Sequence, residues 1–241
     1  MSEPIINPPS WAVAGEALGA AARPLPMTDQ VAAVELITGE QLEKCAPSLS
    51  KQRAAIMAGL LNGLCPQYGI KTKDVLHEFL ANVLQESLEF QHKVENMNYQ
   101  AKTIVKVWPK RFPTLQAAAP YARNPKALAI AAYGSRMGNR PGTEDGWNLR
   151  GSGFIGLTGY FVIEAFRKFK GFATVEQAAA YCRDSDYGAL DSALWFFCVL
   201  KNLMDEAERD EMIGIVKEIN GGLIGLSDRQ RYYDAVKKYV V

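Results

Sequence analysis

Two glutamates of this sequence have the spacing and surroundings to work as a catalytic pair. Glu86 lies near the end of a largely apolar stretch, and Glu95 begins a polar run, 95–98, nine residues further on. Glycosidic bonds are usually cleaved by two carboxyl groups, one protonating the leaving oxygen and the other activating water or attacking the sugar. We therefore predict that Glu86 is the acid and that Glu95, which should stay ionised among polar neighbours, is the base.

Three other acidic or metal-binding patterns compete with this interpretation. Glu89, about one helical turn beyond Glu86, is the main alternative for either role, unless it is simply an exposed helix residue. His77 and Glu78 lack the second histidine of an HExxH motif, so zinc is not expected and a surface pair is the better interpretation. The four cysteines match no metal-ligand spacing and are expected to be buried free thiols.

Helices must position the two glutamates. A capping box at Thr38 begins a helical pattern that continues to Leu64. A second helix is expected from Lys73 to about Phe90, and it carries Glu86. Further helices are expected over the ranges 99–108, 125–133, 161–169, 175–182, 190–201, 209–219 and 227–240.

Composition sets the fold class and the domain organisation. The stretch 134–159 is rich in glycine and should be irregular, and no useful alternating strand pattern occurs, so the class is mainly α. Residues 1–35 are rich in proline and alanine and are predicted to form an arm, either a flexible tail or an anchor for a partner. Residues 36–241 should form one domain. With 27 basic and 26 acidic residues, no field of the whole chain favours nucleic acid or an anionic membrane.

Five motifs taken together resemble glycoside hydrolase family 19, the chitinase-like family, in its bacteriophage lysozyme (endolysin) branch. The resemblance runs from about residue 37 to residue 241, and the motifs occur in the family's order and spacing. They are FLANVLQES (79–87), ENMNY (95–99), YGSRMGN (133–139), DGWNLRGSGFIGLTG (145–159) and INGG (219–222).

The resemblance implies a two-lobed, lysozyme-like helical fold and an inverting mechanism that needs no metal or cofactor. By position in the motifs, Glu86 corresponds to the acid, Glu95 to the base, and Thr158 to a hydroxyl that helps to hold the attacking water. The same correspondence implies six substrate-binding residues: Asn98, Tyr99, Arg136, Asn139, Asn220 and Arg229.

Several positions depart from the family pattern. Gln85 replaces the usual histidine, and Leu88-Glu89 replace a Gly-Gly pair. The second change could lengthen the helix or reshape the cleft. Polar residues of the family are also replaced at three positions expected in the sugar-binding floor: Gly156, Val162 and Ile224. Either specificity has shifted or activity has decayed. The alternatives are therefore a non-catalytic wall-binding or virion structural module that keeps the fold, and a chitinase.

The resemblance leads us to expect a monomeric phage lysozyme that cleaves the amino-sugar glycan of bacterial peptidoglycan, with no nucleic-acid partner and no membrane insertion. The first residues lack the basic start of a signal peptide, so it would be made in the host cytoplasm. It would reach the wall from the periplasm through a phage holin, or be carried in as a virion component. A basic cluster could meet anionic peptidoglycan or nucleic acid, although a solvated face is favoured: Lys93, Lys102, Lys106, Lys110 and Arg111.

Overall fold

The computed structural model describes residues 35–241, and the prediction of a mainly α class is confirmed. Within these residues the backbone pairs as a sheet only at isolated bridges. A short π-helical segment, Trp195–Leu200, follows α10. The helices are α1 (Gly39–Cys45), α2 (Lys51–Leu64), α3 (Lys73–Ser87), α4 (Ala101–Val107), α5 (Leu115–Ala118), α6 (Pro125–Tyr133), α7 (Asp145–Asn148), α8 (Tyr160–Lys170), α9 (Val175–Asp184), α10 (Asp186–Leu194), α11 (Met204–Glu208), α12 (Met212–Asn220) and α13 (Leu226–Tyr239).

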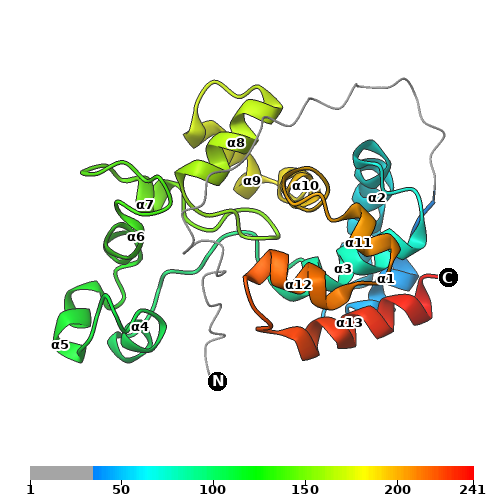
Figure 1. The fold of residues 1–241 in the computed structure, drawn as a ribbon. Helices are drawn as coiled ribbons and strands as arrows, with labels where there is room; N and C mark the ends of the chain where they lie inside the picture. Colours follow the sequence, from blue (N-terminus) through cyan, green and yellow to red (C-terminus); the bar gives the residue numbers. More distant parts are fainter. Residues whose placement is uncertain (1–34) are drawn as a thin grey trace.

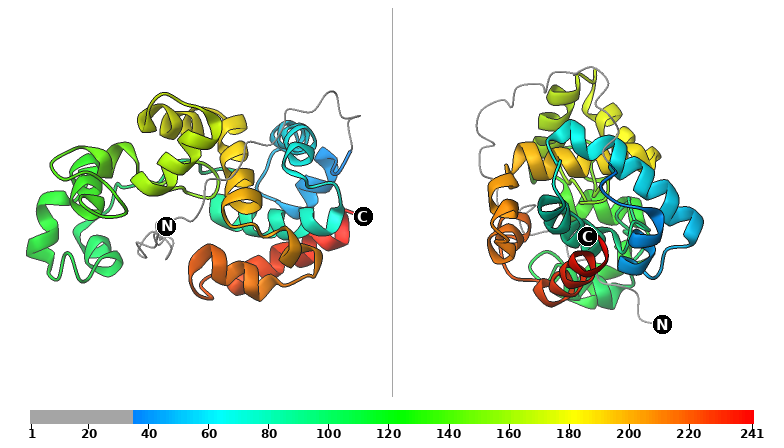
Figure 2. Two further views of the ribbon diagram at one scale, coloured as in Figure 1. Left: turned by 45° about the horizontal axis from the view of Figure 1, so that its top comes forward. Right: turned by 90° about the vertical axis from the view of Figure 1, so that its right-hand side faces the viewer.

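The molecule has two lobes, each with its own hydrophobic core (Figures 1 and 2). The small lobe, residues 96–148, contains α4 to α7, and its core is built around Trp108 and Tyr133. The large lobe contains α1 to α3 and α8 to α13. Two segments connect the lobes, one leading from α3 to α4 and one from α7 to α8. A site at this connection can therefore draw residues from both cores.

Helix α3 is the central element of the large lobe. All its residues from 75 to 84 are buried, and α11 and α13 pack against it. Phe79 meets Phe197 edge to face, with ring centroids 5.5 Å apart. A helix buried on every side is held by tertiary packing more than by its own propensity. Glu86, in the last turn of α3, is therefore attached to a well-fixed support.

Helix α3 ends earlier than predicted, at Ser87 instead of near Phe90. Leu88, Glu89 and Phe90 all have positive φ values, 48°, 60° and 60°, which no α-helix accommodates. The turn is closed by hydrogen bonds from Glu89 N–H to the Leu84 carbonyl, 2.8 Å, and from Phe90 N–H to the Ser87 hydroxyl, 2.8 Å. The Leu88-Glu89 pair therefore does not lengthen the helix, and the chain leaves α3 toward the small lobe.

The helix pattern from Thr38 to Leu64 contains a break that the sequence analysis missed. The capping box at Thr38 is confirmed, but α1 ends at Cys45 and α2 begins again after Ser50, whose hydroxyl accepts from Arg53 N–H. The helix predicted over 209–219 begins later than expected, at Met212, and a short helix before it, α11 (Met204–Glu208), was not predicted. The Ser50 cap sets the start of α2 within an otherwise continuous apolar pattern, whereas α11 and α12 begin without a side-chain cap.

Burial confirms one prediction and corrects another. All four cysteines are free and buried, as expected. His77 and Glu78 are not a surface pair: they are 5% and 0% exposed, on the packed face of α3. Within residues 35–241 no group of three or more potential ligands is placed to hold a metal ion. No helix in this part of the chain is both long and apolar enough to cross a membrane.

Near the start of the described residues, Leu36 and Ile37 are both buried. Their N–H groups donate to the Asn62 side chain on α2, at 2.8 and 3.1 Å, and its amide donates to the Ile37 carbonyl, 2.8 Å. The predicted arm, 1–35, lies outside the described residues except for Glu35.

Candidate active site

The glycine-rich segment after α7 is held against the chain that leaves α3. Val94 and Leu157 each form an antiparallel bridge with Ser152. Glu95 N–H donates to the Gly151 carbonyl, 2.9 Å, and Gly153 N–H donates to the Lys93 carbonyl, 2.9 Å. No strand pattern in the sequence predicted this backbone pairing, which brings two of the predicted motifs side by side.

Glu95 and Thr158 meet across Gly151. A Cβ atom added to Gly151 would lie 2.9 Å from the Glu95 Cβ and 3.5 Å from the Thr158 hydroxyl oxygen. Only a residue without a side chain fits between them. Thr158 is buried, and its hydroxyl donates to the Gly156 carbonyl, 2.8 Å. The structure therefore brings the predicted base and the predicted water-positioning hydroxyl together.

Both carboxylate oxygens of Glu95 accept hydrogen bonds. Tyr133, from the end of α6, donates its hydroxyl to Oε1, and Gly151 N–H donates to Oε2 at 3.0 Å. Burial raises the pKa of Glu95, while the bonds from Tyr133 and Gly151 and the charge of Arg150 oppose the rise. The polar run 95–98 therefore does not leave Glu95 in solvent: its side chain is half-buried, and its donors favour the ionised form that a base needs against the effect of burial.

Glu86 has a charged partner instead. Arg229, on α13, is 1% exposed and donates from one terminal nitrogen to Glu86 Oε1 and from the other to Asn82 Oδ1, 2.7 Å. Asn82 is four residues before Glu86 on α3, so both lie on the same face of the helix. Among the described residues no hydrogen bond to Glu86 Oε2 is formed, so only Oε1 of this carboxyl group has a protein partner.

Glu89, the rival of Glu86, is neither exposed nor helical. It is 7% exposed, and its carboxylate accepts from the Ser48 N–H, 2.7 Å, from the Ser48 hydroxyl, and from the Tyr232 hydroxyl, 2.9 Å. These donors come from the turn before α2 and from α13. Because its oxygens are occupied by structural contacts, Glu89 ties three segments of the large lobe together.

Apart from Arg229, which is bonded to Glu86 and Asn82, the predicted substrate-binding residues divide into two groups. Asn98 is exposed and Arg136 is half-buried, so both can be reached from solvent. Tyr99, Asn139 and Asn220 are buried. The Asn139 amide donates to the Tyr133 carbonyl, 2.9 Å, and accepts from Tyr160 N–H, 2.9 Å, while the Asn220 amide donates to the Ile224 carbonyl, 3.1 Å. These two asparagines shape loops beside the site, and substrate contact by any of the five stays a prediction.

Comparison with known proteins identifies the family. No family model matches the chain. A protein of Haemophilus influenzae (strain ATCC 51907 / DSM 11121 / KW20 / Rd) named glycosyl hydrolase family 19 domain-containing protein is 33% identical over 161 residues, which cover 66% of this chain and 76% of that protein. The chain belongs to glycosyl hydrolase family 19. Its activity class is therefore glycoside hydrolysis.

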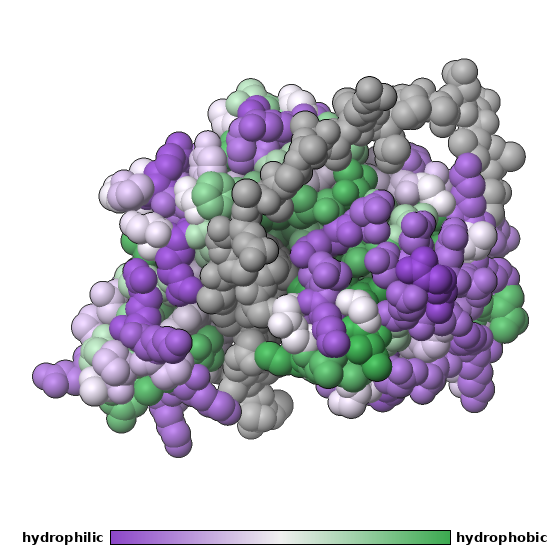
Figure 3. Space-filling view, viewed as in Figure 1, coloured by the Kyte–Doolittle hydropathy of each residue, from purple (hydrophilic) through white to green (hydrophobic). Residues whose placement is uncertain are grey.

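Within this family-19 fold, the three altered floor positions have different surroundings. Val162, in the first turn of α8, is 5% exposed and part of the large-lobe core, so it fills space instead of facing substrate. Gly156 has φ of 69°, and a Cβ there would have no neighbour within 4 Å. Ile224 is 63% exposed and Leu223 48%, in the turn between α12 and α13 where apolar atoms reach the surface (Figure 3).

The sequence analysis did not predict the roles of three residues of the family-19 site, although these residues lie in the quoted motifs. Tyr133 opens the YGSRMGN motif, Asn82 lies in FLANVLQES, and Gly151 lies in the glycine-rich motif. Their roles depend on neighbours 38, 147 and 56 residues away in sequence. Sequence spacing alone carries no signal for such pairs.

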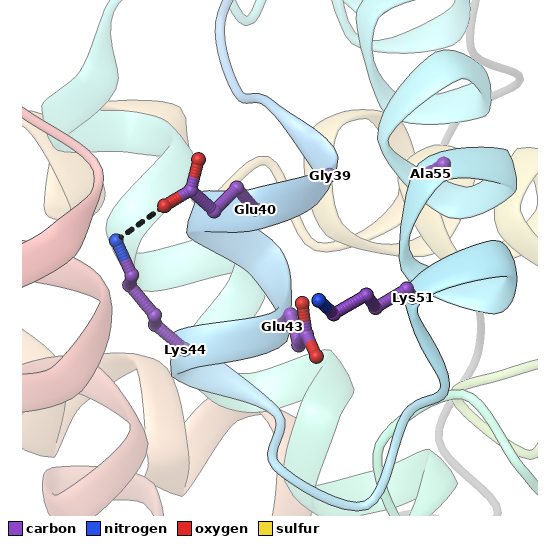
Figure 4. Close-up of a pocket in the computed structure, with 6 residues that line it drawn as sticks. All are labelled: Gly39, Glu40, Glu43, Lys44, Lys51 and Ala55. Carbon is purple, nitrogen blue, oxygen red and sulfur yellow. Dashed lines mark hydrogen bonds and ion pairs between the residues drawn. The ribbon is translucent and has the colours of Figure 1, made fainter.

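A surface hollow lies elsewhere, between α1 and α2, and Figure 4 shows the residues that line it. Its Glu40–Lys44 ion pair, 2.9 Å, is largely exposed, and α1 touches α2 closely at Gly39. The hollow contains none of the motif residues. Its lining is Gly39, Glu40, Glu43, Lys44, Lys51 and Ala55.

Proposed function

We propose that this family-19 protein is a lysozyme that cleaves the amino-sugar glycan of bacterial peptidoglycan with inversion. The observation that carries the mechanism is the unequal state of two carboxyl groups. Glu95 accepts hydrogen bonds at both oxygens, which favour its ionised form, whereas Glu86 has one occupied and one free oxygen. Two carboxyl groups with unlike surroundings are the usual basis for separate acid and base roles.

In the proposed reaction, Glu86 protonates the glycosidic oxygen between two amino sugars from its free Oε2. Arg229 keeps the carboxyl group in place through Oε1 and Asn82. Glu95 takes a proton from a water that Thr158 helps to hold, and that water attacks the anomeric carbon from the opposite face. The glycosidic bond breaks as the water oxygen bonds to carbon, and the leaving sugar keeps the proton from Glu86.

Hydrolysis of purified peptidoglycan beside chitin, with mass analysis of the products, tests this function. We expect muropeptide-bearing fragments from peptidoglycan, and the inverted anomer when the products are followed by NMR. Preferential cleavage of chitin would make the protein a chitinase. No cleavage of either polymer, with binding to the wall retained, would support the non-catalytic module.

We further propose that the protein belongs to a bacteriophage and reaches the wall through a holin or as part of the virion. The anchor hypothesis for residues 1–35 supports the virion route. A chain that begins at Val34 should fold and hydrolyse normally, because the described domain starts with the contacts of Leu36 and Ile37 to Asn62. Incorporation into particles should be lost. If incorporation is unchanged, the holin route is favoured instead.

A further inference from the structure

Charge is distributed very unevenly between the lobes. Between residues 96 and 143 the chain has eight lysines and arginines and no aspartate or glutamate. The remainder has 19 basic residues against all 26 acidic ones. A near-neutral chain thus contains one strongly basic segment, and this segment makes up most of the small lobe.

Four of these cations form an exposed cluster: Lys102, Lys106, Lys110 and Arg111. We call them the α4 cluster. Lys102 and Lys106 are four residues apart on α4 and so share one face. Lys110 and Arg111 lie in the turn that follows, where Arg111 N–H donates to the Trp108 carbonyl, 3.0 Å. This turn keeps the last two charges close to the helix end.

The α4 cluster has no counter-charge within residues 35–241. Lys126 pairs with Glu144, 2.6 Å, and Arg140 pairs with Asp145, 2.8 Å, but no ion pair involves any member of the cluster. Like charges four apart on a helix are mutually unfavourable. Four uncompensated cations at the surface are therefore available for an anionic partner.

The α4 cluster and the base share one small core. Trp108 packs edge to face on Tyr133, with centroids 6.1 Å apart, and Tyr133 donates to Glu95. The side of the core next to Trp108 carries the cluster, and the side at Tyr133 reaches the site. A polymer bound by the cluster is thereby tethered to the lobe that positions the base.

We propose that the α4 cluster binds the carboxylate groups of the peptidoglycan substrate, those of its peptide stems, and so favours this anionic polymer over neutral chitin. This inference rests on the proposed function. Each exposed ion pair is weak and is screened over about 10 Å at 0.1 M salt. Several such pairs along one polymer add up, so binding should depend strongly on salt.

Single-stranded nucleic acid is the less suitable partner. Single strands are usually held by aromatic side chains on which bases stack, in addition to positive charge. The aromatic residues next to the cluster, Trp108 and Phe112, are 6% and 4% exposed and packed on each other. They offer no free ring face of useful size.

The test is binding of the full-length Glu86→Gln protein to insoluble peptidoglycan and to chitin, by co-sedimentation over a salt series. The test variant replaces all four cluster residues by glutamine. The matched control variant replaces four exposed lysines outside the small lobe by glutamine, and so changes the net charge equally. They are Lys51, Lys71, Lys217 and Lys238. Because all eight positions are exposed, thermal unfolding should be unchanged in both.

The parent is the Glu86→Gln protein with the cluster intact. We expect its affinity for peptidoglycan to fall at least tenfold between about 0.05 and 0.5 M salt, because the screening length shortens severalfold over that range. The cluster variant should lose a similar factor at low salt, and the control variant should resemble the parent. Peptidoglycan whose carboxyl groups have been amidated should bind the parent as weakly as untreated peptidoglycan binds the cluster variant. Chitin binding should be equal in all three proteins.

Three results would overturn the inference: a cluster variant that binds peptidoglycan like the parent, an equal loss on chitin, or a DNA duplex that binds the parent more tightly than peptidoglycan does. Hydrolysis by the protein with Glu86 intact is measured in parallel. Cluster-dependent binding without any hydrolysis would refute the proposed function and leave the binding surface established.

Discussion

Glu86 on the large-lobe side of the site has a charged partner, Arg229, whereas Glu95 between the lobes is held by two neutral donors, Tyr133 and the Gly151 N–H. Arg229 is itself fixed by Asn82, so the Glu86 carboxyl group is oriented by a network within two packed helices. Glu95 is oriented by the meeting of two irregular segments. The acid side is thus built on helix packing and the base side on backbone pairing around a glycine.

The difference shows which changes each side should tolerate. On the large-lobe side, a substitution that keeps the shape of Glu86 retains the packing and removes only the proton donor. On the small-lobe side, any side chain at Gly151 would displace Glu95, because the added Cβ would lie 2.9 Å from the Glu95 Cβ. A substitution can therefore remove the chemistry of Glu86 without disturbing its surroundings, whereas a substitution at Gly151 changes the structure and the position of Glu95 together.

The largest effect is expected from Glu86→Gln. It removes the proposed general acid, whose contribution is typically 10²–10⁴-fold, so turbidity clearing of outer-membrane-stripped cells should fall at least about a hundredfold. Glu89→Gln is the matched control, because Glu89 is three residues away and buried but bonded to Ser48 and Tyr232. It should lower thermal stability and leave hydrolysis largely intact. If Glu89→Gln is the crippling change, the assignment of the acid is wrong.

Glu78, two turns before Glu86 on α3, is a third carboxyl group to compare with Glu86 and Glu95, and it is buried without hydrogen-bond donors in the described part of the chain. Neither of its oxygens has a hydrogen-bond partner among the described residues. Burial, and secondarily Asp210, raises the pKa of Glu78 to about 7, with Lys237 opposing the shift. The folded protein then binds this proton more tightly than the unfolded chain, so the stabilisation is complete below about pH 4.5 and is lost as the pH rises through 7.

Chemical denaturation at several pH values measures this effect. We expect the free energy of unfolding of the unmodified protein to fall by roughly 2–3 kcal/mol from this group between pH 5 and 8. Glu78→Gln should remove that part of the pH dependence, whereas the exposed Glu208→Gln should keep it. Equal pH profiles for all three proteins would show that Glu78 gains a partner in solution.

Tyr133→Phe tests the neutral donor of the base side. The tyrosine hydroxyl lowers the pKa of Glu95 against the effect of burial, so its removal should raise that pKa further. Because the base must be ionised, the acidic limb of the kcat/KM profile should move to higher pH. Loss of a hydrogen bond to a charged group, about 1.5–3 kcal/mol, predicts a decrease of roughly ten- to a hundredfold at low pH and less above the limb. Tyr121→Phe, in the same lobe, should leave the profile in place.

Helices with complete local signals were predictable from sequence. The bounds of α6, Pro125–Tyr133, agree with the prediction, because Asn124 caps the helix and Pro125 occupies its first turn. The end of α3 was not predictable, because no glycine marks it. Its left-handed turn depends on the Ser87 hydroxyl and on the packing of Phe90 against Phe154, 64 residues later, with ring centroids 5.1 Å apart.

The candidate site was predictable as a set of residues but not as a set of contacts. The motifs contained Glu86, Glu95 and Thr158, and the structure places the last two on either side of Gly151. Val162 shows the limit of motif comparison: the change from a polar residue suggested a damaged sugar-binding floor, yet the side chain belongs to the core. Whether a position faces substrate or core depends on helix packing that motif spacing does not encode.

The smallest effect concerns Leu88, where a family-typical glycine is replaced. Leu88 has φ of 48° and ψ of 61°, a conformation that costs residues other than glycine about 1 kcal/mol. Leu88→Ala and Leu88→Gly remove nearly the same buried surface, so their comparison isolates this cost, and the glycine variant should be the more stable by about 1 kcal/mol. At Gly59, exposed inside α2 with no neighbour within 4 Å of an added Cβ, alanine should instead be favoured by about 0.5–1 kcal/mol. Thermal unfolding measures whether glycine or alanine is the more stabilising residue at each of the two positions. The same sign at both positions would mean that Leu88 does not hold the left-handed conformation, and that the turn directing Glu95 toward the small lobe is set by Glu89 and Phe90.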